Sequence, residues 1–141
     1  DRLRAMRVHL GSDHAGLELK DHLRAWLTEH GFEPVDHGPF AFDALDDYPV
    51  FCLRAGQGVV DDQAAGLEAL GVVIGGSGNG EQMAANKVRG VRAALVWSVD
   101  TAALSVTCGR APVIQVKNGA CCLAAASRPA SSVTLMPCAR K

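Results

Sequence analysis

Apolar and polar positions along the chain follow two periods, one typical of strands and the other typical of helices. A short β-rich run, RVHLGS, precedes a segment in which Leu19, Leu23, Trp26 and Leu27 recur at helical spacing on one face. Gly31 follows this segment as a helix-ending residue. The pattern indicates a strand followed by an amphipathic helix.

The same alternation continues along the chain. Strands are expected at FEPVDHG, ALGVVIGG, RAALVW and PVIQV. Helices are expected after DDYP, with Pro49 near the start, from Glu81 to Lys87, and at SVDTAAL, with Ser98 or Asp100 as the cap. Helical crossovers separate the strands and two strands are continuously apolar, so the sheet should be parallel and covered on both faces. The prediction is an α/β fold, a three-layer α/β/α domain with a central parallel sheet of about five strands.

Length and charge narrow the class of protein. A chain of 141 residues favours one domain, residues 1–141. The strand pattern starts only at Arg7, so residues 1–5 are expected to be extraneous to the fold. The net charge of −1 provides no field that would attract nucleic acid or an anionic membrane. No apolar stretch approaches the ~20 residues that span a bilayer, and no signal-peptide core is visible. A cytoplasmic enzyme or binding domain is expected, without nucleic-acid or membrane partners.

The cysteines give no metal site. Cys52 stands alone, and the other four of the five cysteines follow residue 107. Their spacing matches no known set of ligands, and no histidine follows His37. Free thiols and no metal are therefore expected.

Polar segments follow four of the predicted strands. They are SDHAG, DDYP, GGSGNGE and WSVD. In a parallel α/β sheet, ligands bind outside the carboxyl ends of the strands. The four segments are therefore expected to converge on one rim that carries the chemistry.

The loop GGSGNG connects the third predicted strand to a helix. It lacks the Lys-Ser/Thr pair of a Walker loop, and it does not open the first crossover as a dinucleotide-binding loop does. Its backbone N–H groups and the helix N-terminus suit a phosphate or a developing oxyanion. The residues concerned are Gly75, Gly76, Gly78, Asn79 and Gly80. A tight turn with close helix–sheet packing is the alternative, and Ser77 could cap the helix or bind a substrate oxygen.

Glu81, directly after this loop, has two interpretations. A glutamate in the first turn of a helix interacts favourably with the helix dipole, which is worth only ~0.3–1 kcal/mol. A carboxylate beside an oxyanion site can instead take a proton from carbon next to a carbonyl, while the N–H groups stabilise the enolate. The second interpretation predicts a proton-abstraction site with Glu81 as its base.

Three spaced motifs resemble those of ribose-5-phosphate isomerase B in its actinobacterial-type form. They are GSDHAG at 11–16, DDYP at 46–49 and GGSGNGEQMAANKVRGVRAALVW at 75–97. The resemblance runs from about Met6 to Leu104. It implies a Rossmann-like fold, a homodimer, and interconversion of ribose 5-phosphate and ribulose 5-phosphate through an enediolate, without metal or organic cofactor.

The resemblance also implies roles for individual residues. Glu81 would be the base, whereas some relatives carry a cysteine base at the position of Gly75. The loop from Gly75 to Gly80 would hold the enediolate oxygen. Four further side chains would contact or assist the substrate: Asp13, His14, Ser77 and Tyr48.

Each of these roles has a structural alternative. Asp13 could cap the first helix, His14 could be an exposed residue of its first turn, and Tyr48 could be half-buried packing. Asn86 and Lys87 are expected to support the rim. No functional role is assigned to the remaining histidines, which are His9, His22, His30 and His37.

The carboxyl third departs from the family pattern after Leu104. Counted without gaps, the family's ring-opening His-Asn pair would fall on Cys108–Gly109 and its first phosphate-binding arginine on Gly119. The segment is rich in Cys, Ala and Ser and contains no acidic residue after Asp100. Part of the tail is expected to be disordered.

Three explanations for residues 105–141 stay open. A frameshift or mispredicted gene end, favoured by the abrupt change in composition, would leave activity poor. A divergent enzyme could use Arg110, Lys117 or Arg128 for phosphate and Cys108 for ring opening, although a thiol with a pKa of about 8.5 is an inferior acid. A relative that only binds sugar phosphates is the third. A hexose 6-phosphate as substrate is a further alternative.

Overall fold

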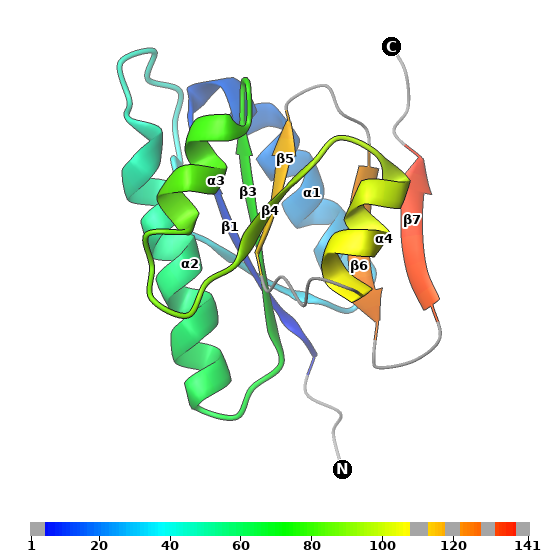
Figure 1. The fold of residues 1–141 in the computed structure, drawn as a ribbon. Helices are drawn as coiled ribbons and strands as arrows, with labels where there is room; N and C mark the ends of the chain where they lie inside the picture. The colour runs from blue at the N-terminus through cyan, green and yellow to red at the C-terminus, as the bar shows by residue number, and fades with distance from the viewer. Residues whose placement is uncertain (1–4, 108–112, 118–121, 128–131, 138–141) are drawn as a thin grey trace.

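A parallel sheet of five strands forms the centre of the molecule (Figure 1). The computed structural model describes residues 5–107, 113–117, 122–127 and 132–137. The strands are β1 (Arg7–Ser12), β2 (Glu33–Asp36), β3 (Ala69–Gly75), β4 (Ala93–Val96) and β5 (Val113–Lys117), in the order β2-β1-β3-β5-β4. All neighbouring strands in the sheet are parallel. The predicted Rossmann-like α/β fold is confirmed.

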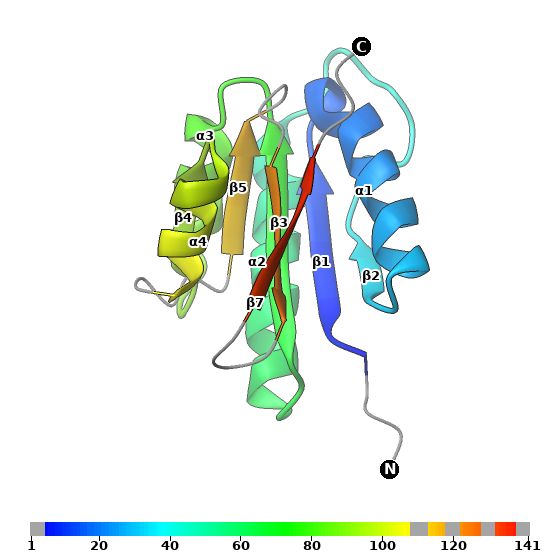
Figure 2. The ribbon, with the colours of Figure 1, turned by 90° about the vertical axis from the view of Figure 1, so that its right-hand side faces the viewer.

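Helices cover both faces of this sheet (Figure 2). The short helix η1 (His14–Gly16) leads from β1 into α1 (Leu17–Glu29), which shares one face with α4 (Val99–Thr107). The opposite face carries α2 (Tyr48–Ala64) and α3 (Asn79–Ala85). Of the helices that the structure describes, none is long and apolar enough to cross a bilayer.

Alternate residues of the central strand supply two separate cores. Val72 and Ile74 of β3 pack with Leu23 of α1, whereas Val73 packs with Val59 of α2. Successive side chains of a strand point to opposite faces, so a strand that is buried along its whole length needs helices on both sides. The continuous apolar run in the sequence therefore predicted the three layers.

Two predicted helix starts are visible in the structure. Pro49 occupies the first turn of α2, where its missing N–H costs nothing. Ser98, rather than Asp100, caps α4, since its hydroxyl oxygen accepts a hydrogen bond from the backbone N–H of Thr101 at 3.2 Å.

The carboxyl third contributes more than β5. The strands β6 (Cys122–Ser127) and β7 (Ser132–Pro137) form a separate antiparallel pair, and α4 lies against β6 (Figure 1). Partial disorder of residues 105–141 stays a prediction, because residues 108–112, 118–121, 128–131 and 138–141 lie outside the described residues. The β-branched residues Val133 and Thr134 favour extended backbone.

A buried lysine fixes the chain where it leaves β2. Lys20 of α1 is fully buried, and its Nζ donates to both oxygens of Asp36, at 2.7 and 2.8 Å, and to the carbonyl oxygen of Pro39 at 2.8 Å. A buried ammonium group is tolerated only when its donors are satisfied in this way. Lys20 thereby holds the first turn of the 37–47 segment against α1.

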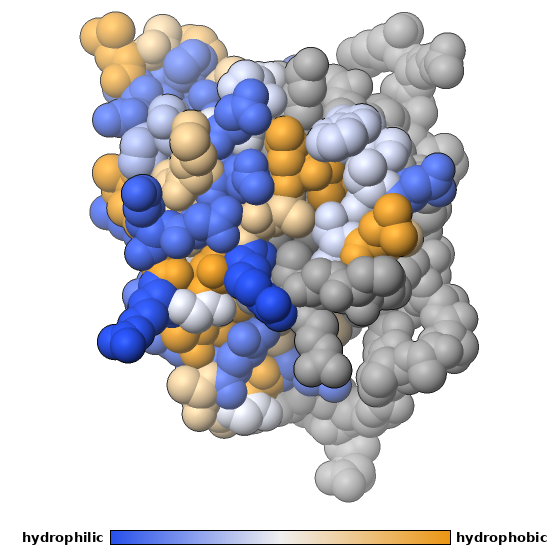
Figure 3. Space-filling view, viewed as in Figure 1, coloured by the Kyte–Doolittle hydropathy of each residue, from blue (hydrophilic) through white to orange (hydrophobic). Residues whose placement is uncertain are grey.

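The rest of the 37–47 segment exposes apolar side chains. Phe40, Phe42 and Leu45 are 76%, 68% and 92% exposed. Apolar surface is visible in Figure 3 at the upper left corner, where Figure 1 shows the chain entering α2. Exposed apolar groups that lie close together often mark an interaction surface.

Candidate active site

The carboxyl ends of β1 and β3 form the rim on which the sequence motifs meet. A Cβ added to Gly16, in η1, would lie 2.8 Å from the carbonyl oxygen of Ile74, in β3. This contact is too close for any side chain, so the SDHAG segment lies directly on the end of β3. The structure therefore brings the first and third motifs together, as the parallel sheet predicted.

Glu81 reaches back from α3 over the end of β3. It lies in the first turn of that helix, and the residue is 4% exposed. Its carboxyl group occupies the space that a Cβ on Gly75 would need. Glycine is required at position 75 for this reason, and the glutamate takes up the space that a side chain there would fill.

The carboxyl group of Glu81 is desolvated and incompletely paired. Burial raises its pKa, and the negative charge of Asp13 raises it further, against backbone hydrogen bonds that lower it. Its Oε2 atom is buried, and no residue that the structure describes hydrogen-bonds to it. Buried carboxylate oxygens normally have partners. A free, desolvated oxygen is a suitable proton acceptor.

Tyr48, at the start of α2, lies against the glycine-rich loop. A Cβ on Gly80 would come within 2.7 Å of the Tyr48 hydroxyl oxygen. Part of the Tyr48 side chain also packs on the core between the sheet and α2. The second motif therefore joins the other two at the rim, with Tyr48 beside the residue that precedes Glu81.

His14 and Asp46 form a hydrogen-bonded pair at the same edge. The Asp46 Oδ1 atom accepts from the His14 ring Nδ1 at 2.8 Å and from the His14 backbone N–H at 3.1 Å. This hydrogen bond, together with the negative charges of Asp13 and Asp43, raises the pKa of His14. Asp46 belongs to the DDYP motif, but sequence reasoning assigned it no role because its partner lies 32 positions away.

Asp13 does cap the first helix, as its structural interpretation predicted. Its Oδ1 accepts from the backbone N–H of Gly16 at 3.0 Å. The charge of Asp13 nevertheless acts on both His14 and Glu81. Capping and a role at the site are therefore compatible.

The loop itself presents both exposed and buried residues. Gly76, Ser77 and Asn79 are exposed, whereas Gly78 is buried and adopts a left-handed conformation, φ +84°, before α3 begins. The Ser77 hydroxyl oxygen accepts from the backbone N–H of Asn79 at 3.4 Å. Contacts of these residues with a substrate stay predictions.

Asn86 lies at the end of α3 away from the rim and joins this helix to the amino end of β4. Its side-chain oxygen accepts from the backbone N–H of Ala93 at 2.8 Å, and its amide donates to the Ala93 carbonyl at 3.0 Å. These bonds join α3 to β4. Asn86 is structural, as expected from the sequence.

Cys52 lies near the site and is not suited to act as a base. It is a free, fully buried thiol, and burial, with the negative charges of Glu81 and Asp13, raises its pKa to about 12. A neutral thiol is a poor proton acceptor. Glu81 is the better candidate for the base.

The carboxyl third reaches the rim through β5. Lys117 pairs with Gly75 in the register of β3 and β5, so its backbone lies beside the glycine-rich loop. The other residues considered for phosphate binding or ring opening lie outside the described residues: Cys108, Gly109, Arg110, Gly119 and Arg128.

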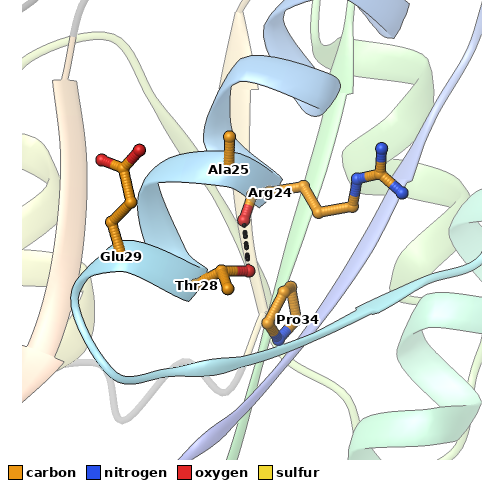
Figure 4. A pocket seen from close by; sticks show the side chains of 5 residues that line it. All are labelled: Arg24, Ala25, Thr28, Glu29 and Pro34. Atoms are coloured by element: carbon orange, nitrogen blue, oxygen red, sulfur yellow. Dashed lines mark hydrogen bonds between the residues drawn. The ribbon is translucent and has the colours of Figure 1, made fainter.

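A surface hollow elsewhere on the molecule is separate from this site. It has a volume of about 490 Å³ and lies between the carboxyl-terminal half of α1 and β2 (Figure 4). Its lining includes Arg24, Glu29 and Pro34. Arg24 and Glu29 lie in the half of α1 that is farther from η1, and the hollow is wide open to solvent. We therefore place the candidate site at the rim.

Residues 8–127 match the model of a protein family described as ribose/galactose isomerase. The chain belongs to this family. The family match continues past Leu104, where the resemblance in the sequence ended, and includes β5 and β6.

Individual relatives agree with this assignment. Ribose-5-phosphate isomerase B of Mycolicibacterium paratuberculosis is 57% identical over 100 residues, which are 71% of this chain and 60% of that protein. A galactose-6-phosphate isomerase subunit of Clostridium acetobutylicum is 36% identical over 97 residues, 69% of this chain and 53% of that protein. This chain spans about 60% of the length of the first of these relatives.

A solved structure matches the fold. Ribose-5-phosphate isomerase B of Mycoplasma genitalium with bound ribulose 5-phosphate has a TM-score of 0.76 and 41% sequence identity to this chain. The match covers 82% of this chain and 74% of that one.

Proposed function

We propose that this chain is an aldose–ketose isomerase that interconverts D-ribose 5-phosphate and D-ribulose 5-phosphate, a reaction of the pentose phosphate pathway. The observation that carries the proposal is the buried carboxyl group of Glu81, which lies over Gly75 with one oxygen unpaired among the described residues. The relatives named ribose-5-phosphate isomerase B support the choice of substrate.

In this proposal the reaction passes through an enediolate. Glu81 takes the proton from C2 of the open-chain aldose and returns it to C1, while the proton of the C2 hydroxyl passes to the C1 oxygen, which leaves the ketose. The backbone N–H groups from Gly75 to Gly80, at the N-terminus of α3, stabilise the negative charge that develops on the substrate oxygen. Asp13, His14, Ser77 and Tyr48 contact the substrate. The chain supplies both the base and the oxyanion donors, so the proposed reaction uses no metal or organic cofactor.

The first test is conversion of ribose 5-phosphate by the purified chain, with Glu81→Gln as the variant. Removing the base should lower the rate at least about 100-fold, while binding of ribulose 5-phosphate, followed by calorimetry, persists. Glu18→Gln is the matched control, since Glu18 lies in the first turn of α1 and is exposed. Equal rates for Glu81→Gln and the unaltered chain would overturn the assignment of the base.

Two alternatives concern the substrate and the chemistry. The similarity to a galactose-6-phosphate isomerase subunit favours hexose 6-phosphates as the second candidate substrate. Running the same assay with both sugar classes separates them. A chain that binds sugar phosphates but exchanges no substrate proton with deuterated solvent would instead be a binding protein.

The contribution of residues 105–141 is tested by a chimera. Replacing all residues after Leu104 with a family-typical carboxyl end tests whether residues 1–104 can form an active isomerase. Activity only in the chimera would mean that the natural carboxyl third limits catalysis. Activity in both would point to residues such as Lys117, whose backbone lies beside Gly75, as a phosphate ligand.

We also propose that the protein is a cytoplasmic homodimer. The exposed side chains of Phe40, Phe42 and Leu45 support an interface at the 37–47 segment, because apolar groups at this density are costly in water. Light scattering on the purified chain tests the dimer. Leu45→Glu should shift the molecule to a monomer, and a monomeric unaltered chain would contradict this proposal.

A further inference from the structure

We propose that His9 and His37 form an acid-sensitive switch. Protonation of both rings separates them and loosens the 37–47 segment, and this change weakens substrate binding at the rim. The regulated site is the one described above, so the inference rests on the proposed function. The two switching side chains themselves lie outside that site.

The two histidine rings meet nitrogen to nitrogen. His9 Nδ1 and His37 Nε2 are 2.8 Å apart, the ring centroids are 5.1 Å apart, and the ring planes differ by 24°. Such a contact needs one hydrogen between the two nitrogens, and either ring can donate it. A neutral pair, or a pair with one added proton, meets this condition. A second added proton places two N–H groups face to face, and the hydrogen bond is lost.

His9 is the fixed member of the pair. The residue is 3% exposed, and its Nε2 atom bonds to Asp62 Oδ2 at 2.8 Å. A Cβ on Gly58 of α2 would overlap His9 Nδ1 and would lie 3.1 Å from His37 Nε2. The backbone of the helix therefore closes the space beside the shared hydrogen bond. His37 is only partly buried, so it is the ring that moves when the bond is lost.

The charges around the pair leave no free counter-ion for a second imidazolium. Four charged side chains of the described residues surround it: Arg7 of β1, Asp36 of β2, and Arg54 and Asp62 of α2. Asp62 already binds Arg7, and Asp36 already binds Lys20. Burial, and then the positive charges of His9 and Arg54, lower the pKa of His37 in spite of the two aspartates. The second proton therefore binds only in acid, and it binds more readily once His37 has moved into water.

Backbone hydrogen bonds join His37 to the carboxyl end of β1. The His37 N–H donates to the Leu10 carbonyl oxygen at 2.8 Å, and the Ser12 N–H donates to the Gly38 carbonyl oxygen at 3.1 Å. These two bonds continue the pairing of β1 and β2 as far as the start of the SDHAG segment. Movement of His37 away from His9 is expected to break them.

The 37–47 segment carries this change to the rim. Asp46 of the segment bonds to His14, and Tyr48 follows it at the start of α2. Lys20 holds the carbonyl oxygen of Pro39 in either state, so acid loosens the segment without releasing it. Substrate that needs the paired state should bind more weakly in acid. By linkage, bound substrate should in turn disfavour the second proton.

Backbone amide exchange followed by NMR on the full chain tests the separation of the rings. Rates at pH 7.5 and pH 5.0 are converted to protection factors, which removes the intrinsic effect of pH on exchange. The amides of Ser12 and His37 should lose protection about tenfold in acid. The amides of Val72 and Val73, in the central strand β3, should keep theirs and thereby exclude global unfolding.

Three variants make this measurement specific. His37→Asn takes up no proton and should show equal protection of these two amides at both pH values. His22→Asn, which changes an exposed histidine of α1, is the matched control and should behave like the unaltered chain. Gly58→Ala places a methyl group against both rings and should give low protection of Ser12 already at pH 7.5, although alanine favours the helix.

Two results of the exchange experiment would overturn the switch. One is a His37→Asn variant that still loses protection in acid. The other is a Gly58→Ala variant in which Ser12 stays fully protected at pH 7.5.

Binding of ribulose 5-phosphate measures the coupling to the site. Calorimetry is done in the Glu81→Gln background, where no substrate should turn over and Glu81 no longer titrates. From pH 7.5 to pH 5.0 the dissociation constant should rise about tenfold more with His37 present than with His37→Asn. Both chains share the titration of His14 and of the substrate phosphate, so the difference isolates the histidine pair.

The outcomes separate this inference from the proposed function. Equal rises of the dissociation constant in the two chains would overturn the regulation and leave the isomerase function standing. No binding by the unaltered chain at either pH would overturn the proposed function and the regulation with it. The exchange measurements would then still decide whether the rings separate in acid.

Discussion

Apart from the Lys20–Asp36 pair, the described part of the molecule buries polar side chains in two places, and the comparison of the two distinguishes stability from chemistry. One place is the rim. The other, which we term the paired cluster, consists of Arg7, His9, His37 and Asp62 and lies between β1, the end of β2 and α2. Asp62 accepts from Arg7 Nη1 at 2.8 and 3.0 Å and from His9 Nε2 at 2.8 Å.

Hydrogen bonds run through the whole paired cluster. Since Asp62 only accepts, His9 Nε2 donates to it, and the other ring nitrogen of His9 shares a hydrogen bond of 2.8 Å with His37 Nε2. The rim is different, because it contains every buried side-chain atom without a partner in the described part of the chain: Ser12 Oγ, Asp46 Oδ2 and Glu81 Oε2. Buried polar groups cost stability unless they are bonded. The rim is therefore locally destabilised at positions where a substrate can supply the missing hydrogen-bond partners. The paired cluster is not destabilised in this way.

The largest predicted effect of a substitution at the rim is on activity, and it would sharpen the contrast between the rim and the paired cluster. Gly75→Ala places a methyl group in the space of the Glu81 carboxyl group and should lower the turnover of ribose 5-phosphate about 100-fold, as expected for a displaced catalytic group. The double variant Gly75→Ala with Glu81→Gln should be no slower than Glu81→Gln alone. A further loss in the double variant would mean that Gly75 acts by another route.

The second prediction concerns stability in the paired cluster. Asp62→Asn removes the acceptor for Arg7 and His9 and should lower the free energy of unfolding by about 2–3 kcal/mol, measured by urea denaturation, with turnover retained. Asp61→Asn is the matched control, because Asp61 is exposed on the same helix and its carboxylate bonds to Gln57 at 2.8 Å. Equal stabilities of the two variants would show that the cluster is not a structural unit.

The third prediction is a gain in stability from a change at the rim. Glu81→Gln should raise the free energy of unfolding by about 1 kcal/mol at pH 8, because it removes a desolvated charge. The raised pKa of Glu81 means that the folded chain holds this proton more tightly than the unfolded chain. Wild-type stability therefore falls as the pH rises from the usual glutamate range through the raised pKa, and the gain should vanish in acid. A gain that is the same at all pH values would exclude this cause.

The smallest predicted effect is a pair of opposite pH slopes. Burial, with the positive charges of His9 and Arg54, lowers the pKa of His37 despite Asp36 and Asp62. Below the usual histidine pKa the unfolded chain binds this proton and the folded chain does not, so stability from His37 is lost as the pH falls. The raised pKa of His14 has the reverse sign, since its stabilisation is present in acid and is lost as the pH rises through the folded pKa.

Thermal unfolding between pH 5 and pH 8 measures both slopes. His37→Asn should flatten the loss of stability in acid, and His14→Gln should steepen it. Changes of the same sign in the two variants would contradict the assignment.

Sequence reasoning found the fold because periodicity is a local signal. The buried run ALGVVIG needs helices on both faces wherever it lies, and the motifs that follow strands must meet in a parallel sheet. The proximity of Glu81 to Gly75 could also be predicted from the sequence, because only six positions separate them.

The missed features depend on long-range pairing. His9 and His37 received no role because nothing local indicates that they share a hydrogen bond with each other and a chain of bonds to Asp62. Asp46 was overlooked as an orienting group for the same reason, although it lies within a recognised motif. Lys20 and Asp36, 16 positions apart, pair only once the sheet has formed. Such contacts are set by strand register, which composition and spacing do not reveal.

The contact of Tyr48 with Gly80 makes the site directly observable. Tyr48 is the single tyrosine of the chain, and its ring rests on the residue before Glu81. Fluorotyrosine incorporated during expression would therefore give one fluorine resonance, and it would come from the candidate site. Titration of that signal with a sugar phosphate reports occupancy without any enzymatic turnover, in the unaltered chain and in variants with no activity.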